Sequence, residues 1–274
     1  MSRRILSELP SLKYPVSQAC TQNQFESPVY KFWCNKIKEA PRYHRKQWEF
    51  CYILQALAVN GKLAPSMRGV GYGVGQEPLT ATFASYGCEI LATDLSTEDA
   101  HSKGWIETQQ HISNKQALND RAICPTEIFE ENVSFEFADM NDIPERYAGF
   151  DFTWSACCLE HLGSIEKGLY FIERSVDTLA PGGIAVHTTE LNCASDVETI
   201  DNEGTVLFRR RDILDLMRRL TWNGHEVVVN FNVGDAPLDQ HIDVPPYSPD
   251  NHLKLMIGQF SSTSYGIIVR KAFD

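Results

Sequence analysis

The sequence lacks any apolar run that approaches the ~20 residues a helix needs to cross a bilayer. Its mean hydropathy is -0.28. The first residues, Met1-Ser2-Arg3-Arg4-Ile5-Leu6, include two arginines, but the apolar core of a signal peptide does not follow them. We therefore expect a cytoplasmic protein with no membrane insertion.

Basic residues are scarce relative to acidic ones. The chain has 25 lysines and arginines against 36 aspartates and glutamates, so its formal net charge is -11. Proteins that bind nucleic acids usually carry a basic surplus, because contacts with phosphates dominate their affinity. We therefore expect no nucleic-acid partner.

The eight cysteines include no C-x-x-C pair, the spacing typical of zinc ribbons and redox motifs. Scattered cysteines in a cytosolic protein are mostly reduced core residues. The adjacent Cys157 and Cys158 are expected to pack, since neighbours in sequence rarely reach disulfide geometry. His241, Asp243 and His252 have a spacing that a metal can use, but proline-rich loops often carry such residues without one. No metal is predicted.

The chain does contain a regular alternation of strand and helix patterns. Predicted strands cover 67–70, 88–93, 133–137, 150–154, 184–188, 227–231 and 265–269, and predicted helices cover 28–60, 77–85, 165–179 and 213–220. Such alternation produces a mostly parallel sheet with helices on both faces. We therefore predict an α/β fold that is Rossmann-like, with a seven-stranded, mostly parallel sheet and an N-terminal helical extension.

The 274 residues, of which 43% are hydrophobic, suffice for a substantial core. Residues 1–60 are predicted to form an N-terminal arm and helical cap, and residues 61–274 a single globular unit. Two connections, His101–Glu131 and Gly234–Ser261, are longer than such a fold requires. Long loops in compact domains are often lids or binding loops.

A glycine-rich run, Gly71-Tyr72-Gly73-Val74-Gly75, follows the first strand of this series and precedes a helix. Glycines at such a turn let the backbone approach a ligand closely and direct the next helix's N-terminus at it. Asp94 ends the second strand, 23 positions after Gly71 (94 − 71). An acid there can accept hydrogen bonds from both hydroxyls of a ribose. A ribose-bearing ligand is therefore predicted.

The glycine spacing distinguishes two classes of ribose-bearing ligand. A dinucleotide site needs G-x-G-x-x-G, whereas this run is G-x-G-x-G followed by Gln76. Downstream stand Phe150-Asp151-Phe152, Leu159-Glu160-His161-Leu162 and Leu179-Ala180-Pro181-Gly182-Gly183. Together with the glycine run, this ordered set resembles that of class I methyltransferases that use S-adenosylmethionine (SAM), over roughly residues 65–270. The phrases Gly71–Leu79 and His187–Glu190 also resemble bacterial methyltransferases of poorly defined substrate.

The resemblance implies a role for residues on the adenosine side of SAM. Asp94 would bind the ribose hydroxyls, and Leu95 would pack on the adenine face. Asp139 and Met140, which follow the third strand of the series, would border the adenine.

It also implies contacts around the methionine side. Gly71, Gly73 and Gly75 would approach the methionine part, and Ser155 and Ala156 would line the sulfonium end.

One position departs from the family's pattern. The family often has an acid two places before the first glycine, where this chain has Gly69. Another group must then hold the cofactor's amino end, and Glu77 or a residue of the N-terminal helices is the candidate. The N-terminal candidates to cover the SAM carboxylate are Tyr43, His44, Arg45 and Trp48.

Methyl transfer to a hydroxyl requires a base near the carboxyl ends of the strands. His161, just after the fourth strand, is the first candidate, although it is equally suited to packing. Glu190 flanks the end of the fifth strand, and His111 lies in the first long connection. These three are the predicted catalytic residues.

The leading functional hypothesis is O-methylation of a small polar acceptor, such as a sugar or a glycan precursor. It rests on the acidic composition, the candidate bases, and Trp154-Ser155-Ala156-Cys157 standing where an Asn/Asp-Pro-Pro-Tyr signature would favour a planar amino nitrogen. N-methylation of a small amine and a noncatalytic SAM-binding or interaction module are the alternatives. The glycine spacing disfavours a third, a nicotinamide oxidoreductase.

Overall fold

A computed structural model of the chain describes residues 4–96, 112 and 114–273, and its centre is one mixed β-sheet. Within these residues the sheet has ten strands, in the order β1-β8-β2-β10-β7-β6-β3-β4-β5, with β9 paired to β10. The strands are β1 (Ile5–Leu6), β2 (Ser17–Ala19), β3 (Arg68–Tyr72), β4 (Glu89–Asp94), β5 (Val133–Phe137), β6 (Phe150–Ala156), β7 (Leu179–Asn192), β8 (Val229–Asn230), β9 (Lys254–Ile257) and β10 (Phe260–Arg270).

The parallel part of the sheet confirms the predicted doubly wound α/β arrangement. Strands β5, β4, β3, β6 and β7 are neighbours in that order and pair in parallel. From β3 the chain runs outward through β4 and β5, and then returns to the other side of β3 as β6. This reversal creates a crevice at the carboxyl ends of β3 and β6, where ligands bind in folds of this kind.

The predicted count of seven strands was wrong, because three short strands join the sheet without a sequence signal. Strand β2 lies between β10 and β8, antiparallel to the first and parallel to the second. Strand β1 extends the same edge beside β8, and β9 pairs with β10. Two short segments of the predicted N-terminal arm, residues 5–6 and 17–19, are therefore strands of the sheet. Strands of two to four residues are too short to show an alternating pattern.

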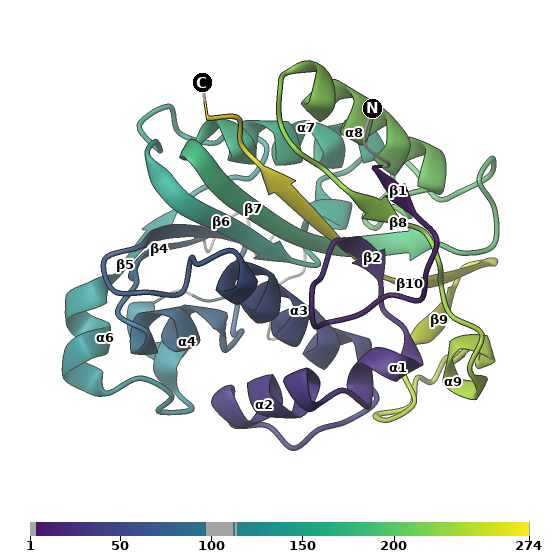
Figure 1. Cartoon of the computed structure of the whole chain (residues 1–274), viewed down its shortest axis with the longest axis horizontal. Helices are drawn as coiled ribbons and strands as arrows, with labels where there is room; N and C mark the ends of the chain where they lie inside the picture. Colours follow the sequence, from purple (N-terminus) through teal and green to yellow (C-terminus); the bar gives the residue numbers. More distant parts are fainter. Residues whose placement is uncertain (1–3, 97–111, 113, 274) are drawn as a thin grey trace.

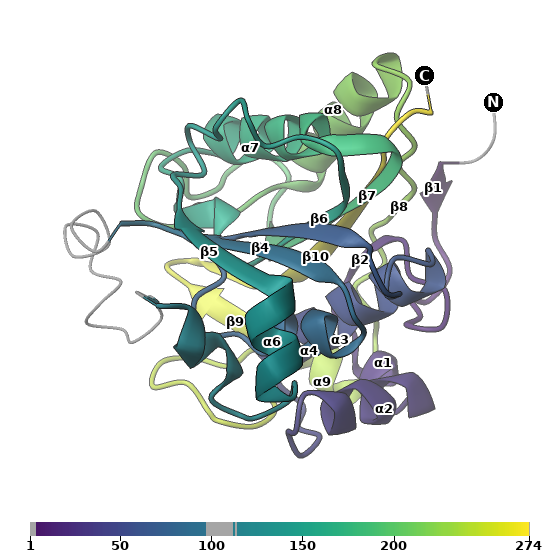
Figure 2. The same cartoon turned by 90° about the vertical axis from the view of Figure 1, so that its left-hand side faces the viewer.

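Helices cover both faces of the sheet (Figures 1 and 2). Helices α7 and α8 pack on one face, and α2, α3, α4 and α6 lie on the other. The longer helices are α2 (Pro28–Lys36), α3 (Arg45–Val59), α4 (Leu79–Ser85), α6 (Thr126–Asn132), α7 (Ile165–Asp177) and α8 (Arg210–Trp222), and single turns form α1 (Gln22–Phe25) and α9 (Pro237–Gln240). The predicted helix over 28–60 is thus two helices, and the second ends beside Gly61 (φ +70°) as expected.

No helix in the described part of the chain is long and apolar enough to span a membrane.

Two glycines in β3 allow aromatic rings of β6 to lie flat against the neighbouring strand. A Cβ added at Gly69 would lie 2.3 Å from the ring of Phe152, and one added at Gly71 would lie 2.2 Å from the ring of Trp154. Both rings are fully buried. This packing explains why Gly69 stands where an acid was expected.

We expect Gly71→Ala to lower the free energy of unfolding by roughly 1–3 kcal/mol, because the added methyl overpacks a buried ring. Urea unfolding followed by circular dichroism measures the effect. Gly204→Ala is the matched control, since a Cβ at Gly204 meets nothing within 4 Å. Equal stability of the two variants would contradict the packing argument.

Candidate functional site

A cavity of about 690 Å³ opens at the carboxyl ends of the central strands. Its lining includes the residues that directly follow four parallel strands: Gly73 after β3, Leu95 after β4, Ala138 after β5 and Cys157 after β6. The start of α3 and the second long connection complete the wall. This volume is in the range of pockets that hold small molecules or cofactors.

The predicted glycine turn and acid meet in this cavity. Gly73 and Gly75 have left-handed backbone conformations (φ +59° and +47°) and line the cavity with Asp94. The Asp94 carboxylate accepts the N–H groups of Gly75 (3.2 Å), Leu95 (2.8 Å) and Ile112 (3.2 Å). A carboxylate offers about four lone-pair positions, so these contacts are compatible with further hydrogen bonds. The acid thus ties the glycine turn to the end of the next strand.

Two residues predicted to bind the cofactor do not line the cavity. Gly71 lies against Trp154 inside the sheet layer. Ser155 is fully buried, and its hydroxyl lies 2.8 Å from Nδ1 of His187. Side chains alternate along a strand, so Ala156 lines the cavity while Ser155 points to the opposite face. That alternation was the sequence signal that could have separated the pair.

The remaining predicted adenosine-side residues do line the cavity. Leu95, Asp139 and Met140 lie at its wall. The Asp139 carboxylate also accepts the N–H of Asn141 (2.8 Å), which fixes the turn after β5. Four strand ends therefore contribute to one wall, as the parallel sheet predicts.

Glu77 lies beside the glycine turn and lines the cavity. Its Oε1 accepts the indole N–H of Trp154 at 2.6 Å. Burial raises the pKa of Glu77 to about 8, although the Trp154 hydrogen bond and the charge of Lys46 act in the opposite direction. The side chain is therefore a neutral acid at neutral pH.

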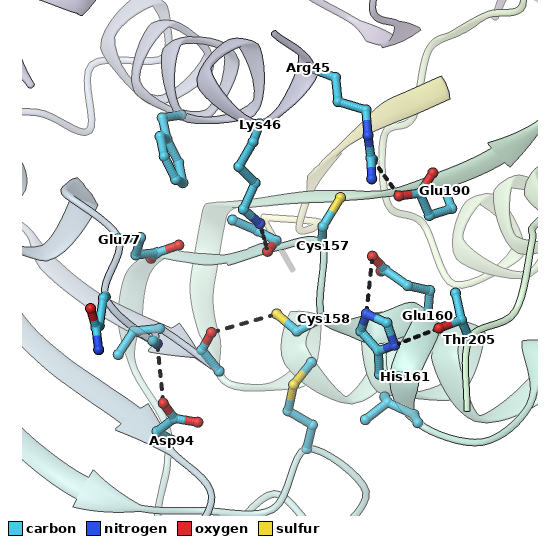
Figure 3. Close-up of a pocket in the computed structure, with 18 of the residues that line it drawn as sticks. Arg45, Lys46, Glu77, Asp94, Cys157, Cys158, Glu160, His161, Glu190 and Thr205 are labelled. Carbon is cyan, nitrogen blue, oxygen red and sulfur yellow. Dashed lines mark hydrogen bonds and ion pairs between the residues drawn. The ribbon is translucent and has the colours of Figure 1, made fainter. Parts of the chain in front are cut away.

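Lys46 enters the same cavity from α3 (Figure 3). Its ammonium donates to the carbonyl of Ala156 at 2.8 Å and lies 3.2 Å from Glu49. Burial would lower the pKa of Lys46, but Glu49 and the other acidic neighbours together outweigh it and raise this pKa, so the amine stays charged. A half-buried cation and a neutral acid thus line the cavity near the glycine turn.

The other end of the cavity holds a buried ionic network (Figure 3). Arg45 pairs with Glu190 and lies 3.6 Å from Glu49. Serine hydroxyls from β10 also donate hydrogen bonds to these two carboxylates: Ser262 donates to Glu190 at 2.8 Å, and Ser264 donates to Glu49. Burial alone would raise the pKa of Glu49, but Lys46 and Arg45 hold it below its usual value. Glu190 is thus engaged in an ion pair.

Glu160 and His161 form the adjoining wall. Glu160 is buried and accepts the Thr189 hydroxyl at 3.1 Å. Burial, reinforced by the charge of Glu190, raises the pKa of Glu160. His161 places Nδ1 2.9 Å from the Gly204 carbonyl and Nε2 3.9 Å from Glu160. His161 and Glu190 are thus brought together, whereas His111 lies outside the described residues.

The second long connection contributes His252 to the site, a residue considered from the sequence only as a metal ligand together with His241 and Asp243. His252 lines the cavity, and its Nδ1 lies 2.6 Å from the Asp243 carboxylate. Its ring stacks on His44, with centroids 4.6 Å apart. His241 is exposed and does not line the cavity. The trio is therefore a histidine–aspartate pair plus a separate surface histidine.

One group among the described residues has the spacing of metal ligands. Cys157, Glu160 and Glu190 each place one ligand atom within 4.8 Å of the others. The Arg45 guanidinium already pairs with Glu190, and burial raises the pKa of the Cys157 thiol, so the group is a poor set of anionic ligands.

No family model matches the chain. Among solved structures it is similar to a 1,6-didemethyltoxoflavin-N1-methyltransferase from Burkholderia thailandensis, with 16% identity, a TM-score of 0.48, and coverage of 84% of this chain and 79% of that chain. A SAM-dependent methyltransferase from Methanosarcina mazei has 12% identity, a TM-score of 0.48, and coverage of 79% and 98%. Phosphoethanolamine N-methyltransferase 2 from Haemonchus contortus has 18% identity and a TM-score of 0.44, and the match spans 74% of this chain but 42% of that chain. These values describe a likeness of fold, and any function rests on the site's own residues.

Proposed function

We propose that this chain is a SAM-dependent methyltransferase that acts on a small polar acceptor. One observation carries the proposal: a single cavity at the crevice between β3 and β6 joins the Gly73–Gly75 turn to the Asp94 carboxylate. Ligands of doubly wound sheets bind at this crevice, and an acid at the end of the second strand is suited to ribose hydroxyls. The remaining lining residues match the other parts of SAM.

The charged groups near the turn suit the amino-acid end of the cofactor. Lys46 is a half-buried cation for a carboxylate, and Glu77 is a buried acid for an ammonium. An ammonium at Glu77 would favour the ionised carboxylate, in the position that Gly69 leaves without an acid. The bound cofactor would supply an electrophilic methyl group on sulfur.

The far end of the cavity suits a compact acceptor with hydrogen-bonding groups. Arg45, Glu160, His161 and Glu190 provide donors and acceptors, and Leu255 and Ile257 provide an apolar wall. We favour O-methylation of a hydroxyl, as in a sugar or glycan precursor. The carboxylates of Glu160 and Glu190 favour N-methylation of a small amine as the second candidate.

The neighbours of each catalytic candidate decide whether it can remove a proton from the acceptor. Glu190 is paired with Arg45, which suits binding and positioning more than proton removal. His161 lines the cavity and stays a candidate base, with Glu160 beside it. We further propose that residues 1–60 act as a cap, because α3 brings Arg45 and Lys46 over the cavity (Figure 3).

We expect Asp94→Ala to weaken binding of S-adenosylhomocysteine (SAH) by ~1.5–3 kcal/mol, or roughly 10- to 150-fold, because a charged hydrogen-bonding partner is lost. Isothermal titration calorimetry measures the dissociation constant. Asp94→Asn is the companion variant, since its amide oxygen can still accept one of the main-chain hydrogen bonds. An unchanged dissociation constant in both variants would refute the assignment of Asp94.

The activity itself is tested with SAM that carries a tritiated methyl group and a panel of sugars, phenols and amines. Differential scanning fluorimetry with SAM, SAH and NAD comes first. Stabilisation by NAD alone would overturn the proposal in favour of an oxidoreductase. SAH binding without turnover on any acceptor would favour the noncatalytic module.

A further inference from the structure

The connection Gly234–Ser261 places two titratable rings, Tyr247 and His252, in the cavity wall. His252 is buried, lines the cavity, and has its Nδ1 2.6 Å from Asp243 Oδ2. Burial would raise the pKa of Asp243, but the hydrogen bonds from His252 and from the Ser248 N–H lower it below its usual value. An ionised Asp243 requires the proton of a neutral His252 to be on Nδ1, and so Nε2 is the acceptor.

The ring is held from several sides, as a catalytic side chain must be. The main-chain N–H of His252 donates to the carbonyl of Tyr43 at 2.8 Å, and the carbonyl of His252 accepts the N–H of Arg45 at 2.9 Å. These bonds fix the backbone that carries the ring. The titratable groups that face the ring are Asp243 and Tyr247 from its own connection and His44 from the start of α3.

His44 does not compete for the proton. Burial and the nearby His252 lower the pKa of His44 to about 4, so this ring stays neutral. Its Nδ1 also accepts the N–H of Lys46 at 3.2 Å, where it caps α3.

The other acids of this end are less suited to proton removal. Glu190 is committed to Arg45, and Glu160 already accepts the Thr189 hydroxyl at 3.1 Å. A histidine oriented by an ionised carboxylate is the arrangement that raises basicity and fixes the tautomer in general-base catalysis.

Resting on the proposed function, we propose that His252, oriented by Asp243, is the general base for a hydroxyl-bearing acceptor. Nε2 of His252 takes the hydroxyl proton while the acceptor oxygen forms its bond to the methyl carbon. The bond between that carbon and sulfur breaks, and its electron pair stays on sulfur. Asp243 is the positioning residue that stabilises the imidazolium.

The first test needs no acceptor. Diethyl pyrocarbonate, which modifies unprotonated imidazole nitrogen, is applied to the SAH-saturated chain, and peptide mass spectrometry follows each histidine. We expect His252 to react through Nε2, and Asp243→Asn to slow it more than about tenfold because the tautomer is no longer fixed. The internal control is His225, whose charged neighbours are Lys271 and Asp177, and its rate stays constant in both chains. An unreactive His252, or equal rates in both chains, would overturn the proposal.

The second test uses whichever hydroxyl compound of the panel accepts a methyl group. We expect His252→Asn, which preserves a donor to Asp243, to lower kcat by about 10²–10⁴-fold. The wild-type rate falls as acid protonates the imidazole, and the variant loses this limb of the pH profile. His241→Asn is the matched control and retains full activity and the same profile. Unimpaired turnover by His252→Asn would overturn the proposal, whereas failure of SAH to bind contradicts the proposed function instead.

Discussion

Replacing Arg45 with methionine is expected to lower the free energy of unfolding by about 3–5 kcal/mol, the scale for breaking a buried ion pair. The guanidinium pairs with Glu190 and lies 3.6 Å from Glu49, and these two carboxylates are almost completely buried. Methionine fills similar space but leaves Glu190 as an uncompensated charge. Lys46 still faces Glu49, so Glu190 carries most of the cost.

The double variant Arg45→Met/Glu190→Gln separates lost charge from lost packing. Removing both partners should recover most of the lost stability, because a neutral pair in this position has little desolvation cost. Urea unfolding of the wild type, both single variants and the double variant completes the cycle. A single Arg45→Met variant within about 1 kcal/mol of the wild type would show that water screens the pair.

Glu77→Gln is expected to change how stability depends on pH. The pKa of Glu77 is about 8 in the folded chain, against a usual 4.5. The folded state therefore holds a proton that the unfolded state releases, so the contribution of Glu77 to stability is full below pH 4.5 and is lost as pH rises to about 8. Glutamine keeps an acceptor for the Trp154 N–H but cannot ionise.

The expected size is on the order of 5 kcal/mol, from about 1.4 kcal/mol for each unit of pKa difference. Relative to the wild type, Glu77→Gln should therefore gain stability between acidic pH and pH 8.5. Urea unfolding at several pH values measures this difference. Glu145→Gln, which removes one surface charge, is the matched control. Parallel pH profiles for the wild type and Glu77→Gln would contradict the buried neutral acid.

The same residue links the stability experiment to the cofactor. If a ligand ammonium occupies the position beside Glu77, the carboxyl must ionise and release its proton. Calorimetric titration of SAH near neutral pH, in two buffers with different ionisation enthalpies, should then detect proton release in the wild type and a smaller release in Glu77→Gln. Equal proton release in both chains would place the ammonium elsewhere.

Local patterns in the sequence determined the parallel half of the fold. The strand 133–137 was predicted with the bounds of β5, and the glycine turn and Asp94 were placed at adjacent strand ends, where they meet. These features are local, since a buried strand of five residues or a left-handed turn requires particular residue types at fixed spacing. The amphipathic pattern of α7 and the glycine that ends α3 are of the same kind.

Only the tertiary structure decided which side chains share the cavity. Alternation along β6 separates Ser155 from Ala156, but only the packing decides that Ala156 faces the cavity and Ser155 faces His187. Lys46 comes from α3, Glu77 from the loop that precedes α4, and His252 from a connection that has no periodic pattern. Strands β1, β2 and β9 form because an existing sheet edge offers them partners. Contacts of this kind join residues far apart in the chain, so their cause lies in packing and burial and leaves no local pattern in the sequence.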